Sequence, residues 1–133
     1  MQHVLPYLWV ALGSAIGGAL RHGVNRASIA LLGPHLPGGT LFVNLAGGFA
    51  MGLAAGFFSL RGEGPSPGLR LFLTTGILGG FTTFSAFSLD AAQLWQRGDG
   101  ALAAAYVLAS VLGSIAAVFT GLALMRWMLG PAP

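Results

Sequence analysis

Long apolar stretches alternate along the chain with short links that are rich in glycine, proline or charge. A helix that crosses a bilayer needs about 20 mostly apolar residues. Four stretches reach that length, over approximately residues 4–32, 39–60, 69–95 and 101–129. The links between them, "GPHLPGG", "RGEGPSPG" and "QRGDG", are too short to hold another domain. The pattern predicts an all-α membrane protein with four transmembrane helices in a single domain, residues 1–133.

Composition agrees with a membrane location. Hydrophobic residues make up 55% of the 133 residues and charged residues only 7%, whereas about a quarter of a soluble domain is charged. The absence of cysteine excludes disulfides and thiolate chemistry. Basic and acidic residues are both scarce, so the sequence does not indicate nucleic-acid binding. The N-terminus lacks a basic start and is followed by equally apolar segments, so we do not expect a cleaved signal peptide.

The arginines give no preferred orientation in the bilayer. Cytoplasmic flanks normally carry an excess of Lys and Arg. With four crossings, three arginines fall on each side: Arg61, Arg70 and Arg126 on one, and Arg21, Arg26 and Arg97 on the other. This balance is typical of a chain that inserts in both orientations and pairs as a dual-topology antiparallel homodimer. The alternative is that so small a count is noise, or that other factors orient the chain.

Glycines at helical spacing indicate where helices touch. Gly48, Gly52 and Gly56 repeat every four residues in the second span, and Gly13 and Gly17 do so in the first. Small residues let membrane helices approach closely, so we expect helix contacts on these faces. The alternative is that glycine is simply common in membrane helices.

The third span carries an unusual polar stretch, "GGFTTFSAF", at residues 79–87. Its glycines lower helix propensity, and the hydroxyls of Thr82 and Thr83 can compete for backbone partners. We therefore expect a helix broken near the membrane midplane. Carbonyls freed there must be buried in protein, face water or bind an ion. Oxygen donors without carboxylates suit a cation such as sodium better than a transition metal. A kink healed by neighbouring side chains is the alternative.

Phe84 and Phe87 stand three residues apart, so they share a helical face beyond the expected break. The edge of an aromatic ring is weakly positive and can solvate a small anion. Such a pair is also common in a helix core or facing lipid, and composition alone does not separate these roles.

Three motifs in order, "GGALRH" at 17–22, "GTLFVNLAGGFAMG" at 39–52 and "GGFTTFSAF" at 79–87, resemble the Fluc (CrcB) family of bacterial fluoride channels. The resemblance covers all four spans. It implies an antiparallel homodimer with two pores, in which the third helices cross at their breaks. It also implies a structural sodium ion that is not transported, held by backbone carbonyls of Gly79 and Thr82.

The resemblance also implies roles for pore residues. Phe84 and Phe87 match the phenylalanines whose ring edges contact fluoride. Asn44 matches an asparagine near the floor of an aqueous vestibule, where its amide could donate to fluoride; a structural interhelical hydrogen bond is the alternative. In the fourth span three hydroxyl residues resemble the family's polar track: Tyr106, Ser110 and Ser114. Without the resemblance, their spacing by four would indicate helix–helix hydrogen bonds.

Four further positions have roles that the motifs leave open. Arg21 matches a vestibule arginine that could attract anions, or it snorkels to the interface. His22 and Ala86 depart from the residues that many relatives carry, an aromatic residue and a threonine. Asp90 is expected to pair with an arginine near the membrane edge, and a proton-carrying role is the alternative.

The interpretation is a passive, fluoride-selective channel of the bacterial plasma (inner) membrane that exports toxic fluoride from the cytoplasm. Its expected partners are fluoride, sodium, a second copy of the chain and the bilayer. An enzyme is not expected, because no catalytic or phosphate-binding motif is present. The closest rival is a small proton-coupled exporter, although the first span lacks the acidic residue that such transporters use. A packing subunit without transport activity would leave the polar residues unexplained.

Overall fold

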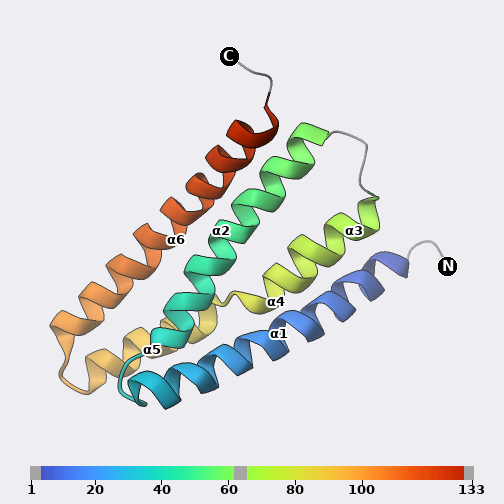
Figure 1. Ribbon diagram of the computed structural model, residues 1–133. Helices are drawn as coiled ribbons and strands as arrows, with labels where there is room; N and C mark the ends of the chain where they lie inside the picture. Colours follow the sequence, from blue (N-terminus) through green and yellow to red (C-terminus); the bar gives the residue numbers. More distant parts are fainter. Residues whose placement is uncertain (1–3, 62–65, 131–133) are drawn as a thin grey trace.

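The computed structural model describes residues 4–61 and 66–130, and the regular secondary structure of these residues is helical, without a strand. The predicted all-α fold class is confirmed for this part of the chain. Two long helices come first, an interrupted segment of four short helices follows, and one long helix closes the chain (Figure 1). The elements are α1 (Leu5–Leu32), α2 (Gly38–Arg61), α3 (Pro67–Leu71), η1 (Phe72–Leu78), α4 (Gly79–Phe81), α5 (Phe84–Gln96) and α6 (Gly100–Leu129).

Among the described residues, three helical segments are long and apolar enough to cross a membrane: Gly38–Arg61, Pro67–Gln96 and Gly100–Leu129. Their bounds lie within two residues of those predicted from hydrophobicity. The first helix, α1, has 28 residues, but polar residues in its second half, among them Arg21, Asn25 and Arg26, make it less apolar than the other three. Its crossing of the membrane therefore stays a prediction.

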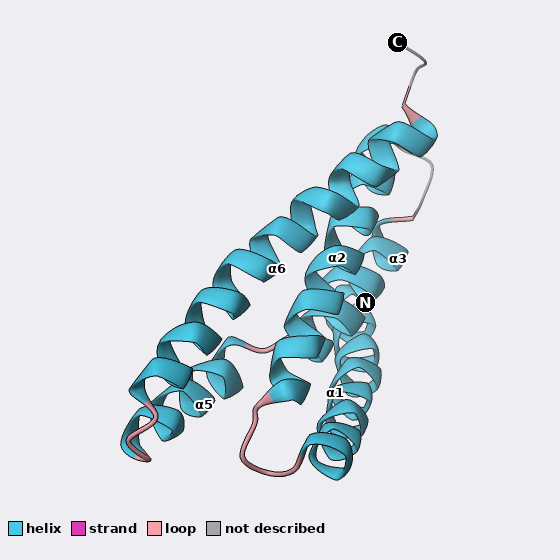
Figure 2. Ribbon diagram, turned by 60° about the vertical axis from the view of Figure 1, so that its left-hand side comes forward, coloured by secondary structure: helices cyan, strands magenta, loops and turns pink. Residues whose placement is uncertain are grey.

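The predicted break in the third span is present, at Thr82 and Thr83. Both residues have extended backbone, with φ −83° and ψ 159° at Thr82 and φ −156° and ψ 125° at Thr83. Helix α5 then starts at Phe84, and the side chain of Thr83 caps it by accepting from the N–H of Ala86 at 3.2 Å. Figure 2 shows this link as a short loop in the middle of the bundle. The polar stretch thus divides one apolar segment into two helices.

A second irregularity was not predicted. Residues 72–78 form a π-helix, η1, just before the break. Gly76 of η1 lies buried against Gly13 of α1, with no side chain between the two backbones. Wide π turns are rare in regular helices and depend on stabilising surroundings. Close packing against α1 supplies such surroundings here.

Glycines bring the long helices into direct backbone contact. In Figure 1, α6 lies beside α2, and α1 lies along η1 and α4. A Cβ atom on Gly52 would collide with the Val118 carbonyl of α6, and one on Gly17 would collide with the Ile77 carbonyl of η1. Similar close contacts surround Gly13, Gly48 and Gly56. The prediction that these glycines mark helix contacts is confirmed.

Two neighbouring glycines of α1 should respond in opposite ways to alanine. A Cβ on Gly17 would meet backbone atoms of Ile77 and Phe81, whereas one on Gly18 would meet nothing within 4 Å. We expect Gly17→Ala to destabilise the protein by about 1–3 kcal/mol through overpacking. Gly18→Ala should be neutral or stabilising by up to about 1 kcal/mol, because alanine favours helix. Thermal unfolding in detergent, followed by circular dichroism, measures both. Equal melting temperatures for the two variants would contradict this packing.

Candidate functional site

A groove of about 390 Å³ lies where α2, the break, α5 and α6 meet. We call it the central groove. Six predicted residues line it: Asn44, Thr82, Phe84, Phe87, Ser110 and Ser114. None of its lining residues is charged. The structure therefore brings most of the predicted site together, while Arg21, Gly79 and Tyr106 lie outside the lining.

Asn44 holds the break in place. Its Oδ1 accepts from the backbone N–H of Thr83 at 2.8 Å, and its Nδ2 donates to the Thr83 carbonyl at 2.9 Å. One side-chain amide thus satisfies both backbone groups of a buried residue that has left the helix. The interhelical hydrogen bond that the sequence left as an alternative is present. One Nδ2 hydrogen stays free of Thr83, so donation to fluoride stays a prediction.

The break releases backbone carbonyls from their helical partners. In a continuous α-helix the Gly79 carbonyl would accept from the N–H of Thr83, and the Thr82 carbonyl from the N–H of Ala86. Those two N–H groups instead donate to Asn44 Oδ1 and to Thr83 Oγ1. The predicted sodium ligands are therefore two carbonyls that do not accept the hydrogen bonds of a continuous α-helix. Gly79 is also exposed on the surface of the single chain.

Arg21 reaches the break from α1. Its Nη1 donates to the Thr82 carbonyl at 3.2 Å, across 61 residues of sequence. The guanidinium does not extend to the end of the helix, so the snorkelling alternative is wrong. Arg21 does not line the central groove, and its predicted role in attracting anions to a vestibule stays a prediction.

The two predicted pore phenylalanines have different surroundings. Their ring centroids lie 5.4 Å apart with the planes tilted by 52°. Phe87 is buried, with 8% of its surface exposed, and its ring packs 5.6 Å from that of Tyr106. Phe84 is 78% exposed in the single chain. Phe87 is therefore packed within its own chain, whereas the ring of Phe84 is exposed on the surface of the single chain.

Hydroxyl residues of α6 lie along one buried face. Tyr106 and Ser110 are 6% and 4% exposed. The Oγ of Ser110 is buried and has no hydrogen-bond partner among the described residues, and Ser110 lines the central groove beside Ser114. An unpaired buried hydroxyl is costly unless a ligand or water satisfies it. This face of α6 therefore offers a hydrogen-bond donor to an occupant of the groove.

Asp90 corrects one expectation. Its Oδ2 accepts from the Tyr106 hydroxyl at 3.1 Å, and it makes no salt bridge within 4.0 Å in residues 4–61 and 66–130. The predicted pairing with an arginine is therefore not present in the described part of the single chain. A tyrosine one helix away, at a sequence separation of 16, is the partner instead.

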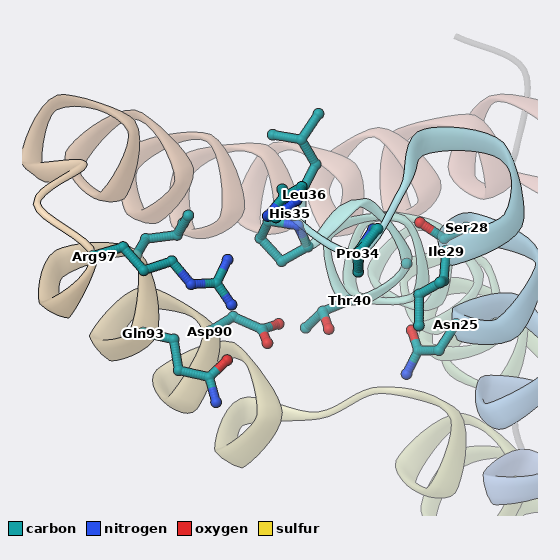
Figure 3. Close-up of a pocket in the computed structure, with 13 residues that line it drawn as sticks. Asn25, Ser28, Ile29, Pro34, His35, Leu36, Thr40, Asp90, Gln93 and Arg97 are labelled. Carbon is teal, nitrogen blue, oxygen red and sulfur yellow. The ribbon is translucent and has the colours of Figure 1, made fainter.

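Asp90 also lines a second cavity, of about 180 Å³, beside the link between α1 and α2. Figure 3 shows Asp90 and Gln93 of α5, with Arg97 directly after α5, on one side of it and Asn25 and Ser28 of α1 on the other. The Oδ1 of Asn25 and the Oγ of Ser28 are buried without a partner in the described part of the chain. Sequence reasoning missed this cavity. The available signal was the spacing of Asn25 and Ser28, three apart and so on one helical face.

The comparisons with known proteins identify the family of the chain. Residues 8–122 match the family described as "CrcB-like protein, Camphor Resistance (CrcB)". The chain belongs to this family. The resemblance drawn from the three sequence motifs is thereby confirmed, and the chain is a multi-pass membrane protein.

Curated relatives cover nearly the whole chain. A protein of Rhodopseudomonas palustris (strain BisB5) is 54% identical over 122 residues, which are 92% of this chain and 98% of the relative. A protein of Methylobacterium nodulans is 56% identical over 123 residues, with the same two shares. One from Chelativorans sp. (strain BNC1) is 55% identical over 124 residues, 90% of this chain and 95% of the relative. All three are named "Fluoride-specific ion channel FluC".

The two hydrogen bonds of Asn44 to Thr83 should contribute to the stability of the protein. Asn44→Asp removes the donor to the Thr83 carbonyl, and Asn44→Leu removes both bonds while keeping a similar volume. We expect each change to destabilise the protein by about 1–3 kcal/mol, because buried backbone groups lose their partners. Gln93→Glu, at an exposed amide, serves as the control. Thermal unfolding in detergent gives the comparison, and an unchanged melting temperature for Asn44→Leu would show that Asn44 does not hold the break.

Proposed function

We propose that the chain is a passive fluoride-selective channel that lets fluoride leave the bacterial cytoplasm across the inner membrane. The central groove carries this proposal, because it joins aromatic edges, a serine hydroxyl and an asparagine amide in an apolar span. The names of the curated relatives, which describe an ion channel rather than an enzyme, support it. No catalytic activity is proposed.

The groove suits an anion that must enter and leave quickly. Fluoride loses hydration on entering an apolar span, and hydroxyl and amide donors replace part of it. The unpaired Oγ of Ser110 is one such donor, and the second Nδ2 hydrogen of Asn44 is another. The ring edges of Phe84 and Phe87 add weak positive charge. Because no lining residue is a cation, an anion would be solvated without being trapped, as conduction requires.

The functional unit of this proposal is an antiparallel homodimer with four crossings per chain. The exposure of Phe84, at 78%, supports it, because a pore aromatic needs a second surface against it. Gly79, five residues earlier in the chain, is also exposed in the single chain, and the partner would cover it as well. Arg21 lies at the break, which leaves Arg26 and Arg97 toward one end and three arginines toward the other. That distribution remains nearly even, as insertion in both orientations requires.

We further propose a structural sodium ion at the break, held by the carbonyls of Gly79 and Thr82. The donor set fits a hard monovalent cation, because both carbonyls have lost their helical partners. Within the described ranges no three His, Cys, Asp or Glu side chains group to hold a metal, so a transition metal has no ligands there. The ion would supply positive charge that satisfies the freed carbonyls. It takes no part in conduction.

Proteoliposome efflux measured with a fluoride electrode tests the channel. We expect fast fluoride release by the wild type and none of comparable rate for chloride. Ser110→Ala should slow release about tenfold, since the lost donor is worth about 1–1.5 kcal/mol. Phe84→Ile should also impair release. Phe119→Ile, at an exposed phenylalanine of α6 outside the groove, should leave it unchanged. Absence of fluoride release from folded, dimeric wild type would refute the proposal.

A proton-coupled exporter is the second candidate, because Asp90 is an acid hydrogen-bonded inside a helical span. The two mechanisms differ in their driving force. We expect fluoride efflux to follow the membrane potential set by a potassium gradient and valinomycin, at equal pH on both sides. Asp90→Asn should not abolish that efflux. Efflux that needs an imposed proton gradient, and that Asp90→Asn removes, would favour the exporter.

A further inference from the structure

Arg21 contacts the backbone of the break. The Nη1 of Arg21 donates to the Thr82 carbonyl at 3.2 Å. Thr82 is also fixed by the helical turn before it. Its Oγ1 donates to the Leu78 carbonyl at 2.9 Å, and its backbone N–H donates to the same carbonyl at 3.0 Å. The free direction at Thr82 is therefore that of its carbonyl, and Arg21 is the side chain bonded to it.

The small residues of α1 make this contact possible. Gly17 lies one helical turn before Arg21 and packs directly on the backbone of Ile77 and Phe81. Ser14 of α1 lies similarly close to Gly80. The axis of α1 is therefore near enough to α4 for the side chain of Arg21 to reach the carbonyl that follows α4.

A carbonyl oxygen has two lone pairs. Arg21 uses one, so a cation could bind the other without displacing the guanidinium. Both groups are positive and would share one oxygen, and like charges repel strongly in surroundings of low dielectric constant. Arg21 therefore orients the Thr82 carbonyl and at the same time makes it a weaker cation ligand.

We propose that Arg21 is a positioning residue that holds the break when no cation is bound and sets how weakly the break binds one. This inference rests on the proposed sodium site of Gly79 and Thr82. Removal of the guanidinium should loosen the break in sodium-free solution and tighten sodium binding. An anion-attracting role alone predicts neither effect, because it requires no contact between Arg21 and the Thr82 carbonyl.

The test is thermal unfolding of the purified dimer in detergent, with sodium chloride exchanged for N-methyl-D-glucamine chloride at constant ionic strength. Without sodium, Arg21→Gln should melt at a lower temperature than the wild type. The sodium concentration that gives half of the stabilisation should fall at least about fivefold in this variant. Arg21→Lys keeps the charge and should restore the wild-type midpoint to within about twofold. His22→Gln, at the exposed neighbour of Arg21, is the matched control.

Two results with Arg21→Gln would overturn the inference. An unchanged or higher sodium midpoint in Arg21→Gln would show that the guanidinium does not oppose the cation. Failure of this variant to fold in saturating sodium would show that the cation cannot replace it. Fluoride efflux by the wild type is measured on the same preparation. If the wild type releases fluoride but its melting temperature does not respond to sodium, the cation site and this inference are refuted and the channel proposal stands. If the melting temperature responds to sodium but no fluoride is released, only the channel proposal is refuted.

Discussion

The rest of the structure depends on one constraint: backbone groups that leave a helix inside an apolar bundle must find new partners. Thr82 and Thr83 have extended backbone, and no water is available in hydrocarbon to satisfy them. Asn44 of α2 satisfies both backbone groups of Thr83, and Arg21 of α1 satisfies the Thr82 carbonyl. The break is thus held from two sides by two helices. The break removes the hydrogen-bond partners that a continuous helix would supply. Asn44 and Arg21 stabilise the break because they replace those partners.

That constraint in turn fixes how closely the helices pack. The side chains of Asn44 and Arg21 can reach the break only if the helix backbones lie close together. The glycines allow this close approach. Gly47 lies against the Thr82 side chain, where a Cβ atom would collide with it, and Gly17 lies against the backbone of α4 and η1. Glycine costs helix stability at each such position. Its use on the faces that meet the break indicates that proximity matters more here than helix propensity.

The bounds of the long apolar helices and the place of the break could be predicted, because both follow from local composition. Hydrophobic length marks the spans, and glycine next to threonine marks the interruption. The π-helix at 72–78 could not be predicted, since it depends on the contact of Gly76 with Gly13. The partners of Asn44, Arg21 and Asp90 were missed for the same reason: each lies on another helical segment. Sequence pattern identified the polar residues of the site, and tertiary packing decided what each one contacts.

The position of the charges bears on the proposal that the central groove conducts an anion. An arginine in the central groove would hold an anion strongly, because its charge would be little screened there. Arg21 instead donates to the backbone carbonyl of Thr82, and Asp90 and Arg97 line the separate cavity near the α1–α2 link. Only dipoles and ring edges remain to solvate an ion in the groove, and their attraction is weak at each point. A series of weak contacts lets an ion advance, because no single step is deep enough to stop it.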